Sequence, residues 1–204
     1  MTPANVVIVP TGTANLASVL AAFRRLGADP RVATTVAEVD EARRVVVPGV
    51  GAFGAAMGEL TRLGLASNLH ERVEGNRPTL AICVGMQLLA ATSEESEGRV
   101  GLGVVAGSVT RFPETVNVPQ LGWNEVRAGA GCNVLTDGWA YFANSFRFAS
   151  VPDGWSAALS DHGGSFVAAM ERGNVLACQF HPELSGNWGR ELLIRWLDTT
   201  GVAA

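Results

Sequence analysis

Lysine is absent from this chain of 204 residues, and all fifteen of its basic residues are arginines. The absence excludes Schiff-base chemistry on a lysine amine and a phosphate-binding loop of the Walker type, which needs a lysine. The net charge of −4, without any basic cluster, also disfavours nucleic acids and anionic membranes as partners. The composition favours a small metabolite or another protein as the ligand.

Cysteine and histidine are scarce. The three cysteines are Cys83, Cys132 and Cys178, and the three histidines are His70, His162 and His181. The cysteines are widely spaced and never form Cys-x-x-Cys, so we expect neither a disulfide framework nor a metal site. We expect no cofactor either. Any mechanism that uses an imidazole has only three candidates for that group.

Long hydrophobic runs are missing, although 48% of the residues are hydrophobic. Runs such as Val6 to Val9 and Val45 to Val47 are too short to span a bilayer, and no basic, apolar leader precedes the first of them. We therefore expect a cytoplasmic protein. The length suits one well-filled core, so we expect a single domain over residues 1–204.

Short apolar runs alternate with helical patterns in the first half of the chain. We expect strands at 6–9, 30–33, 44–47 and 79–83, and helices at 16–26, 36–41, 55–63, 65–73 and 86–92. From residue 102 the pattern changes to short β-like pieces, before a last strand at 174–180 and a helix at 187–197. This predicts an α/β fold with an open, mostly parallel central sheet, helices on both faces and a small antiparallel β edge region.

The stretch from Thr79 to Leu89 is typical of a nucleophile on a sharp strand-to-helix turn. A strand runs into Cys83, and an apolar helix follows. Ala81 and Gly85, two residues before and after the cysteine, are small enough for strand and helix to approach closely. A buried structural thiol is the alternative, so partners must come from elsewhere in the chain.

Two other strand ends supply such partners. After the strand at 44–47, the glycine-rich run from Pro48 to Phe53 can turn its N–H groups inward. The last strand ends in His181-Pro182-Glu183, where extended backbone would point His181 and Glu183 to the same side, so that the carboxylate orients the imidazole. Because C-terminal ends of parallel strands share one edge, we predict a Cys-His-Glu triad there.

The segments 48–53, 81–89 and 179–185 resemble the three signatures of class I, triad-type glutamine amidotransferases. Within that family the chain resembles the glutaminase subunits of imidazole glycerol phosphate synthase. Further matching pieces are Asn15-Leu16-x-Ser-Val, Pro119-x-x-Gly-Trp-Asn, Tyr141-Phe142-x-x-Ser145 and the Gly-x-x-Leu-Leu of the last helix. The resemblance covers nearly the whole chain and implies a flavodoxin-like fold.

The resemblance implies hydrolysis of L-glutamine to glutamate and ammonia through a γ-glutamyl thioester on Cys83. His181 would act as base and acid, and Glu183 would orient it. The oxyanion donors would be the Val84 amide and an amide of Gly49, Val50 or Gly51, a loop that switches conformation in the family. The ammonia would pass to a (β/α)8-barrel cyclase subunit, the partner in a heterodimer, which makes imidazole glycerol phosphate and AICAR in histidine biosynthesis.

The resemblance also assigns residues to glutamine and to the partner. Gly51, Gln87, Glu95, Asn144 and Ser145 match glutamine-contacting positions, and Asn15, Gln120, Trp123, Tyr141 and Leu184 match or neighbour positions that face the cyclase. Departures from the family pattern are the loop Pro10-Thr11-Gly12-Thr13-Ala14, Gln120 and Asn144 in place of histidines, and Leu184 in place of a common lysine. These departures leave the triad intact and put partner identity and coupling in doubt.

Three other functions stay open from the sequence. The chain could be a diverged amidotransferase that feeds ammonia to another synthase. It could be a non-catalytic subunit that keeps the fold as an activator, although the intact triad speaks against this. Third, it could be a general cysteine hydrolase of γ-glutamyl compounds, which would be fully active without a partner. For Glu95 the alternative to a glutamine contact is one more solvated carboxylate of a loop.

Overall fold

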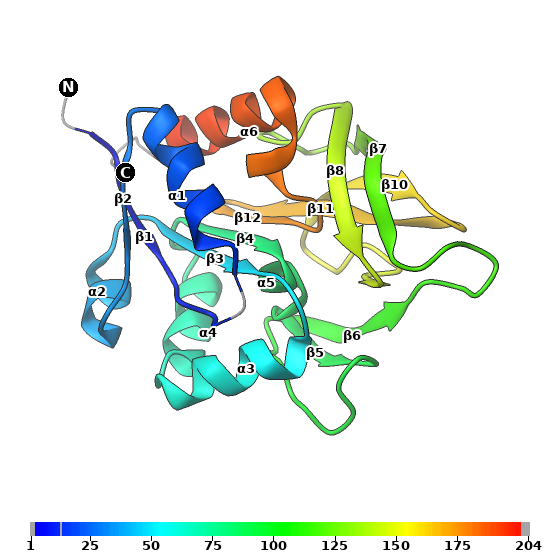
Figure 1. The fold of residues 1–204 in the computed structure, drawn as a ribbon, viewed down its shortest axis with the longest axis horizontal. Coiled ribbons are helices and arrows are strands. Elements are labelled where there is room, and N and C mark those ends of the chain that lie inside the picture. The colour runs from blue at the N-terminus through cyan, green and yellow to red at the C-terminus, as the bar shows by residue number, and fades with distance from the viewer. Residues whose placement is uncertain (1–2, 13, 201–204) are drawn as a thin grey trace.

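A nine-stranded sheet in the order β2-β1-β3-β4-β12-β11-β10-β7-β8 forms the centre of the molecule in a computed structural model that describes residues 3–12 and 14–200 (Figure 1). Its parallel half contains β1 (Asn5–Ile8), β2 (Asp29–Val32), β3 (Val45–Gly49), β4 (Thr79–Cys83) and β12 (Val175–Cys178). The strands β3, β4 and β12 are buried along their whole length, as their apolar sequences require of strands covered on both faces.

The antiparallel half continues the same sheet beyond β12. It contains β11 (Ser165–Arg172), β10 (Ser156–Asp161), β7 (Gln120–Ala128) and β8 (Gly138–Asn144). The predicted α/β class with a mostly parallel central sheet is therefore confirmed. The antiparallel region is larger than expected, because it extends the central sheet by whole strands instead of forming a separate edge.

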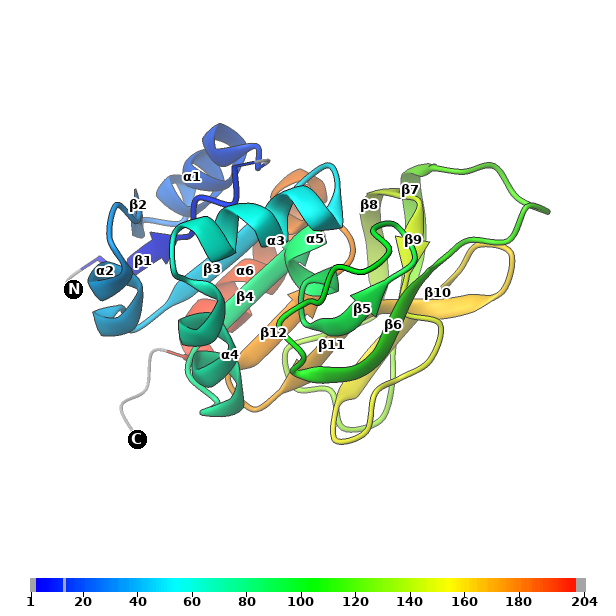
Figure 2. The same ribbon diagram turned by 90° about the horizontal axis from the view of Figure 1, so that it is seen from below.

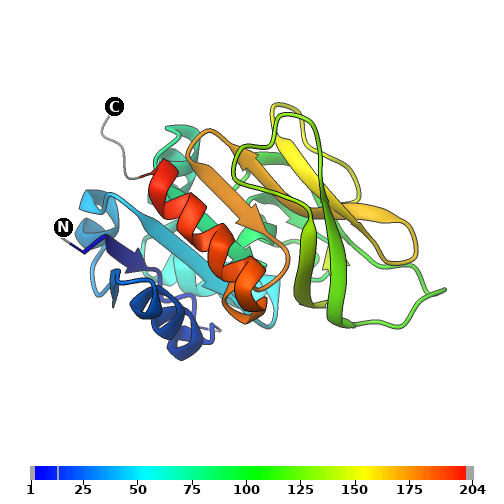
Figure 3. The ribbon, with the colours of Figure 1, turned by 90° about the horizontal axis from the view of Figure 1, so that it is seen from above.

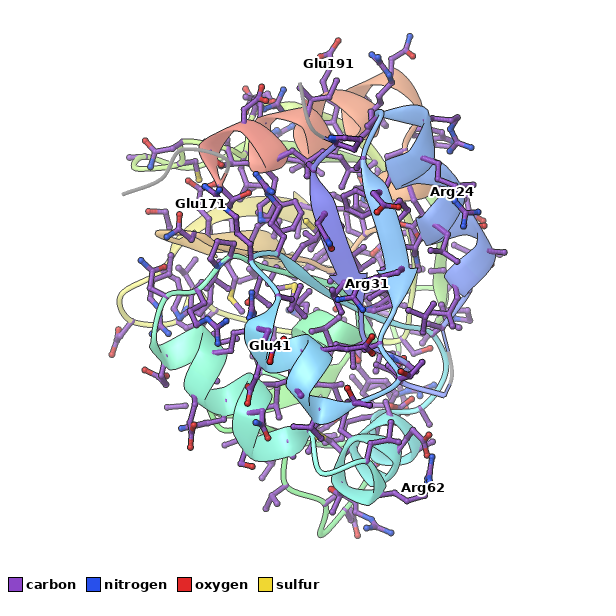
Figure 4. The ribbon with its side chains drawn as sticks, turned by 90° about the vertical axis from the view of Figure 1, so that its left-hand side faces the viewer. Arg24, Arg31, Glu41, Arg62, Glu171 and Glu191 are labelled. Carbon is purple, nitrogen blue, oxygen red and sulfur yellow. The ribbon has the colours of Figure 1, made fainter. Side chains whose placement is uncertain are left out.

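Helices cover the two faces of the parallel half, as predicted. Helices α1 (Leu16–Arg25) and α6 (Gly186–Thr199) lie together on one face (Figure 3), where the rings of Phe23 and Trp196 are 6.1 Å apart. Helices α2 (Val36–Glu41), α3 (Phe53–Arg62) and α4 (Ala66–Glu74) lie on the other side (Figure 2). Figure 4 shows charged side chains of these helices, such as those of Arg24 and Arg62, pointing outward.

The helix predicted for residues 86–92 is wrong. Helix α5 (Val84–Gln87) is a single turn, and the chain then enters β5 (Ala90–Ser93), which pairs with β6 (Val105–Arg111); β6 in turn pairs with β9 (Phe146–Arg147) in a small second sheet. The carbonyls that a longer helix would use are taken by residues 101–105. Leu102 N donates to Leu88 O at 2.7 Å, and Val105 N donates to Leu89 O at 2.8 Å. Tertiary pairing thus overrides the local apolar pattern.

The buried carboxylate of Glu171, labelled in Figure 4, holds the loop before β8 to the sheet. It accepts the backbone N–H groups of Val134 and Leu135 at 3.1 and 3.0 Å, and that of Asn133 as well. Successive backbone donors around one carboxylate satisfy its buried charge without a cation. The loop before β8 is thereby held against the end of β11.

Two general properties of the described residues bear on function. None of their helices combines the length and the apolar character needed to cross a membrane, and no cluster of metal-ligating side chains occurs among them. The divergent loop of residues 10–14 includes Thr13, which lies outside the described residues. Its neighbour Thr11 is buried and donates its hydroxyl to Pro48 O at 2.7 Å, so this loop contacts the glycine-rich loop.

Candidate active site

The three predicted strand ends meet at one edge of the sheet. In the register, Gly49 of β3 lies opposite Cys83 of β4, and Cys178 of β12 lies opposite Ile82. The residues that follow β12 therefore emerge beside Cys83. The glycine-rich loop, the cysteine and the segment that contains His181 are gathered where parallel sheets bind ligands.

Cys83 is a buried residue with a backbone in the left-handed region. Its φ of 56° and ψ of −112° place it at the sharp turn between β4 and α5. Such strain in a non-glycine residue is typical of a nucleophile that projects from a sheet edge. The turn needs glycines around it, because a Cβ on Gly85 would lie 1.9 Å from Val47 O and one on Gly49 would lie 2.9 Å from Val84 Cβ.

His181 and Glu183 form the predicted pair, although by a different backbone from the one expected. His181 Nδ1 is 2.9 Å from Glu183 Oε1, and both side chains are almost fully buried. The extended backbone predicted for this segment is wrong, because η1 (Pro182–Leu184) is a 3-10 turn that begins after His181. Ser185 Oγ donates to His181 O at 2.6 Å, and this bond helps to close the turn.

The electrostatics of His181 favour its charged form. Burial by itself would lower the pKa of His181, but hydrogen bonds with Cys83 and Glu183, and the negative charges of these groups, raise it from 6.5 to about 10. A protonated imidazole beside Cys83 stabilises the thiolate, which is the nucleophilic form of cysteine. In contrast, burial raises the pKa of Cys178 well above its usual value and leaves that thiol neutral.

A buried amide network that sequence reasoning missed contacts the sulfur of Cys83. Gln179 Nε2 is 3.8 Å from Cys83 Sγ, and Gln179 Oε1 accepts from Gln87 Nε2 at 2.9 Å. Gln87 Nε2 also donates to Phe146 O at 3.0 Å. One signal could have identified Gln179: a polar residue that directly follows an apolar strand, two positions before His181, needs a buried partner.

Of the other residues expected to contact glutamine, Glu95, Asn144 and Ser145 lie around the ends of β5 and β8, and Gly51 lies in the loop between β3 and α3. Glu95 is not a freely solvated carboxylate, because its Oε2 accepts the backbone N–H of Phe53 at 2.6 Å, at the start of α3. Asn144 is buried and donates to Phe146 O at 3.0 Å. Ser145 uses its carbonyl to accept from Phe112 N, and Gly51 is exposed with a φ of 89°.

The residues expected to face a partner are divided by the pleat of β7 and β8. Trp123 is 53% exposed and packs edge-to-face on Tyr141, its cross-strand neighbour. Trp139, which was not predicted, is 57% exposed on the same face. We call Trp123, Tyr141 and Trp139 the aromatic ridge. Gln120 was expected to face the partner, but its side chain is buried because alternate residues of β7 point to opposite faces.

The last two predicted partner residues lie in η1 and at the start of α1. Leu184 is an exposed apolar residue of that turn, and it follows Glu183 directly. Asn15 caps α1, whose first turn it holds by accepting from Ser18 N at 3.3 Å. The side chain of Asn15 therefore has a structural role whether or not a partner contacts it.

Comparison with known proteins agrees with this geometry. The family model described as "Glutamine amidotransferase class-I" matches residues 7–197. A protein of Symbiobacterium thermophilum named imidazole glycerol phosphate synthase subunit HisH is 40% identical over 95% of this chain and 93% of its own length. The chloroplastic imidazole glycerol phosphate synthase hisHF of Arabidopsis thaliana is 39% identical over 94% of this chain, which matches 34% of that longer protein.

Solved structures show the same fold at lower sequence identity. A crystal structure of a glutamine amidotransferase has a TM-score of 0.77 at 21% identity, covering 96% of this chain and 99% of that chain. The structure of PurLQS from Thermotoga maritima has a TM-score of 0.76 at 16% identity, covering 97% of this chain and 99% of that chain. Because the family match spans residues 7–197 and the relatives align over nearly the whole chain, this protein belongs to the class-I glutamine amidotransferases.

Proposed function

We propose that this chain hydrolyses L-glutamine to glutamate and ammonia, and that a cyclase subunit uses the ammonia to make imidazole glycerol phosphate and AICAR in histidine biosynthesis. The observation that carries the proposal is the strained Cys83 beside the buried pair of His181 and Glu183. The names of the relatives support the pathway. The continuous sheet supports a single domain over the whole chain.

We assign a step of the reaction to each residue of the proposed triad. The Cys83 thiolate attacks the side-chain carbonyl carbon of glutamine, and a tetrahedral oxyanion forms. His181 gives a proton to the departing nitrogen as the C–N bond breaks, which releases ammonia and leaves a γ-glutamyl thioester. His181 then removes a proton from water, whose oxygen attacks the thioester, and glutamate leaves as the C–S bond breaks. Glu183 holds the imidazole through Nδ1 at 2.9 Å.

The oxyanion of both steps needs donors beside the elbow. We assign one to the backbone N–H of Val84, which opens α5 directly after Cys83. The second comes from the loop of Gly49, Val50 and Gly51, because Gly49 packs against Val84 and Gly51 has the left-handed backbone that lets an amide change direction. One such donor is typically worth about 10²–10³ in rate.

The substrate and the partner would lie on neighbouring surfaces. We propose that Gly51, Gln87, Glu95, Asn144 and Ser145 surround the glutamine, with Glu95 near its α-ammonium group. We propose further that the aromatic ridge, with Leu184 and Asn15, meets the cyclase in a heterodimer. Trp123 and Trp139 are exposed on one face of two neighbouring strands, and tryptophan is enriched among the residues that carry binding energy at protein interfaces.

Glutamine turnover measured with and without the cyclase and its ligand tests the proposal. We expect glutamate and ammonia to form, faster when the cyclase holds its substrate, and we expect Cys83→Ala to abolish both products. Cys132→Ala is the matched control, because Cys132 lies outside the site, in the loop between β7 and β8, and its replacement should leave turnover unchanged.

Each alternative gives a different result in the same assay. No product under any condition would refute an enzymatic role and favour a non-catalytic subunit. Full turnover without a partner would favour a general hydrolase of γ-glutamyl compounds. Turnover that a different synthase stimulates, but the cyclase does not, would identify a diverged amidotransferase.

A further inference from the structure

The sulfur of Cys83 has a hydrogen-bond donor outside the triad. Gln179 follows the last residue of β12, and the parallel register places it next to Cys83 on the neighbouring strand. Its side chain is 0% exposed, and its Nε2 lies 3.8 Å from Cys83 Sγ. On another side of the sulfur is Ala143 O at 4.0 Å, an acceptor for the thiol proton. The thiol form thus has an acceptor nearby, and the thiolate form has a donor.

The orientation of the Gln179 amide is determined by a backbone carbonyl at the far end of the network. Phe146 O can only accept, so the group of Gln87 that faces it at 3.0 Å must be the NH2. The same NH2 faces Gln179 at 2.9 Å, so Gln179 must present its oxygen there. The NH2 of Gln179 is therefore the group that points at the sulfur. Asn144 also donates to Phe146 O, at 3.0 Å.

We propose that Gln179 is a catalytic residue that donates an N–H hydrogen bond to the Cys83 sulfur, and that Gln87 is the positioning residue that keeps this N–H turned toward it. A donor of this kind binds the anionic sulfur more strongly than the neutral thiol, because charge-assisted hydrogen bonds are about twice as strong as neutral ones. Burial strengthens the effect, since water does not compete for either group.

The donor would act at two points of the reaction and transfers no proton itself. Before attack, it raises the fraction of Cys83 that is thiolate. During hydrolysis of the thioester, the sulfur leaves as an anion, and the same N–H stabilises the charge that develops there. The effect on the thiolate does not depend on glutamine, whereas the effect on turnover rests on the proposed function.

This role is additional to the glutamine contact proposed for Gln87. A residue that only contacts glutamine would change KM when replaced and leave the free thiol unaffected. A residue that positions Gln179 would change the reactivity of Cys83 toward a reagent that does not resemble glutamine. Iodoacetamide is such a reagent, because it lacks the α-ammonium and α-carboxylate groups.

The experiment measures alkylation of Cys83 by iodoacetamide between pH 5 and 10, followed by mass spectrometry of the peptide that contains it. Gln179→Met keeps the length of the side chain and removes the donor. We expect its alkylation rate at neutral pH to fall about tenfold and the midpoint of the pH profile to rise by about one pH unit. Gln87→Met should lower the rate by roughly threefold, because the amide of Gln179 can then turn over.

Two further variants separate a hydrogen bond from packing. Gln179→Glu keeps the shape and the acceptor for Gln87 but places an oxygen against the sulfur, so its rate should fall below that of Gln179→Met. Leu176→Met is the matched control, because it exchanges a buried residue of β12, the strand that Gln179 follows, with little change in volume. Its alkylation profile should equal that of the unaltered protein.

The results that overturn the proposal are distinct. Unchanged alkylation in both variants of Gln179 refutes the hydrogen bond to sulfur, and an equal fall in Leu176→Met shows that packing is the cause. A change in KM alone for Gln87→Met refutes its positioning role. Failure of the unaltered chain to hydrolyse glutamine would refute the proposed function, yet the alkylation experiment would still decide the role of Gln179.

Discussion

Replacing Gly85 by alanine should displace Cys83, the proposed nucleophile, with little effect on the rest of the fold. The added Cβ would lie 1.9 Å from Val47 O, whereas real Cβ atoms essentially never come within 3.0 Å of such an atom. Neither the carbonyl nor the turn is a flexible side chain, so α5 must move away from β3. Overpacking of this kind costs about 1–3 kcal/mol, which for a domain of this size lowers Tm by roughly 2–12 °C.

Gly85→Ala should lose most of its glutamine turnover at temperatures at which the protein is still folded. A displacement of about 1 Å at the reacting atoms can cost about 10²-fold in rate. We expect glutamine turnover to fall by about this factor at 20 °C, where circular dichroism should still show a folded protein. Gly58→Ala is the control, because a Cβ there meets nothing within 4 Å and alanine favours a helix by about 0.5–1 kcal/mol. If Gly85→Ala kept the Tm and turnover of the unaltered chain, the close approach at the elbow would be refuted.

Three further predictions concern groups around the site. The protonated form of His181 should stabilise the fold, because the pKa of its imidazole rises from 6.5 to about 10 on folding. This contribution is complete below pH 6.5 and is lost progressively as the pH rises to about 10. Tm measured over this range should fall less steeply in His181→Asn, and equal slopes would contradict the ion pair. Glu95→Ala should destabilise the start of α3 by about 0.5–2 kcal/mol in urea, and no change would show that its bond to Phe53 N is worth nothing. Glu171→Ala should cost about 3 kcal/mol or more, because it leaves buried amides unpaired, and a loss below about 1 kcal/mol would refute that role.

The sequence predicts most of the parallel half because local and global signals agree there. Runs such as Val45 to Val47 are apolar at every position, as expected of central strands that are covered on both faces. Gly27 follows α1 and ends that helix where its apolar periodicity also ends. The proximity of the candidate residues Cys83 and His181 could be predicted for the same reason. Cys83 and His181 each follow a buried parallel strand, so topology alone brings them to one edge.

The rest could not be predicted because it depends on pairing between distant segments. Residues 88–91 are apolar enough for a helix or a strand, and hydrogen bonds from the amides of residues 101–105 to their carbonyls determine that they do not continue the helix. The exposure of Gln120 depends on the register of β7 with β8, which the sequence does not fix. The 3-10 turn after His181 is closed in part by a hydrogen bond from Ser185 Oγ to His181 O. The orientation of the Gln179 amide depends on its hydrogen bond from Gln87, which is far away in the chain.

The position of β12 also determines the order in which the candidate active site can form during folding. This strand comes late in the chain, yet it lies between β4 and β11 and is the link between the two halves of the sheet. Its pairing with β4 joins Val175 to Thr79, which closes a long loop and makes this step slow compared with local helix formation. Neither half of the sheet can bring His181 beside Cys83 until this strand is inserted. Recovery of Cys83 reactivity during refolding should therefore follow completion of the sheet and report the final step of folding.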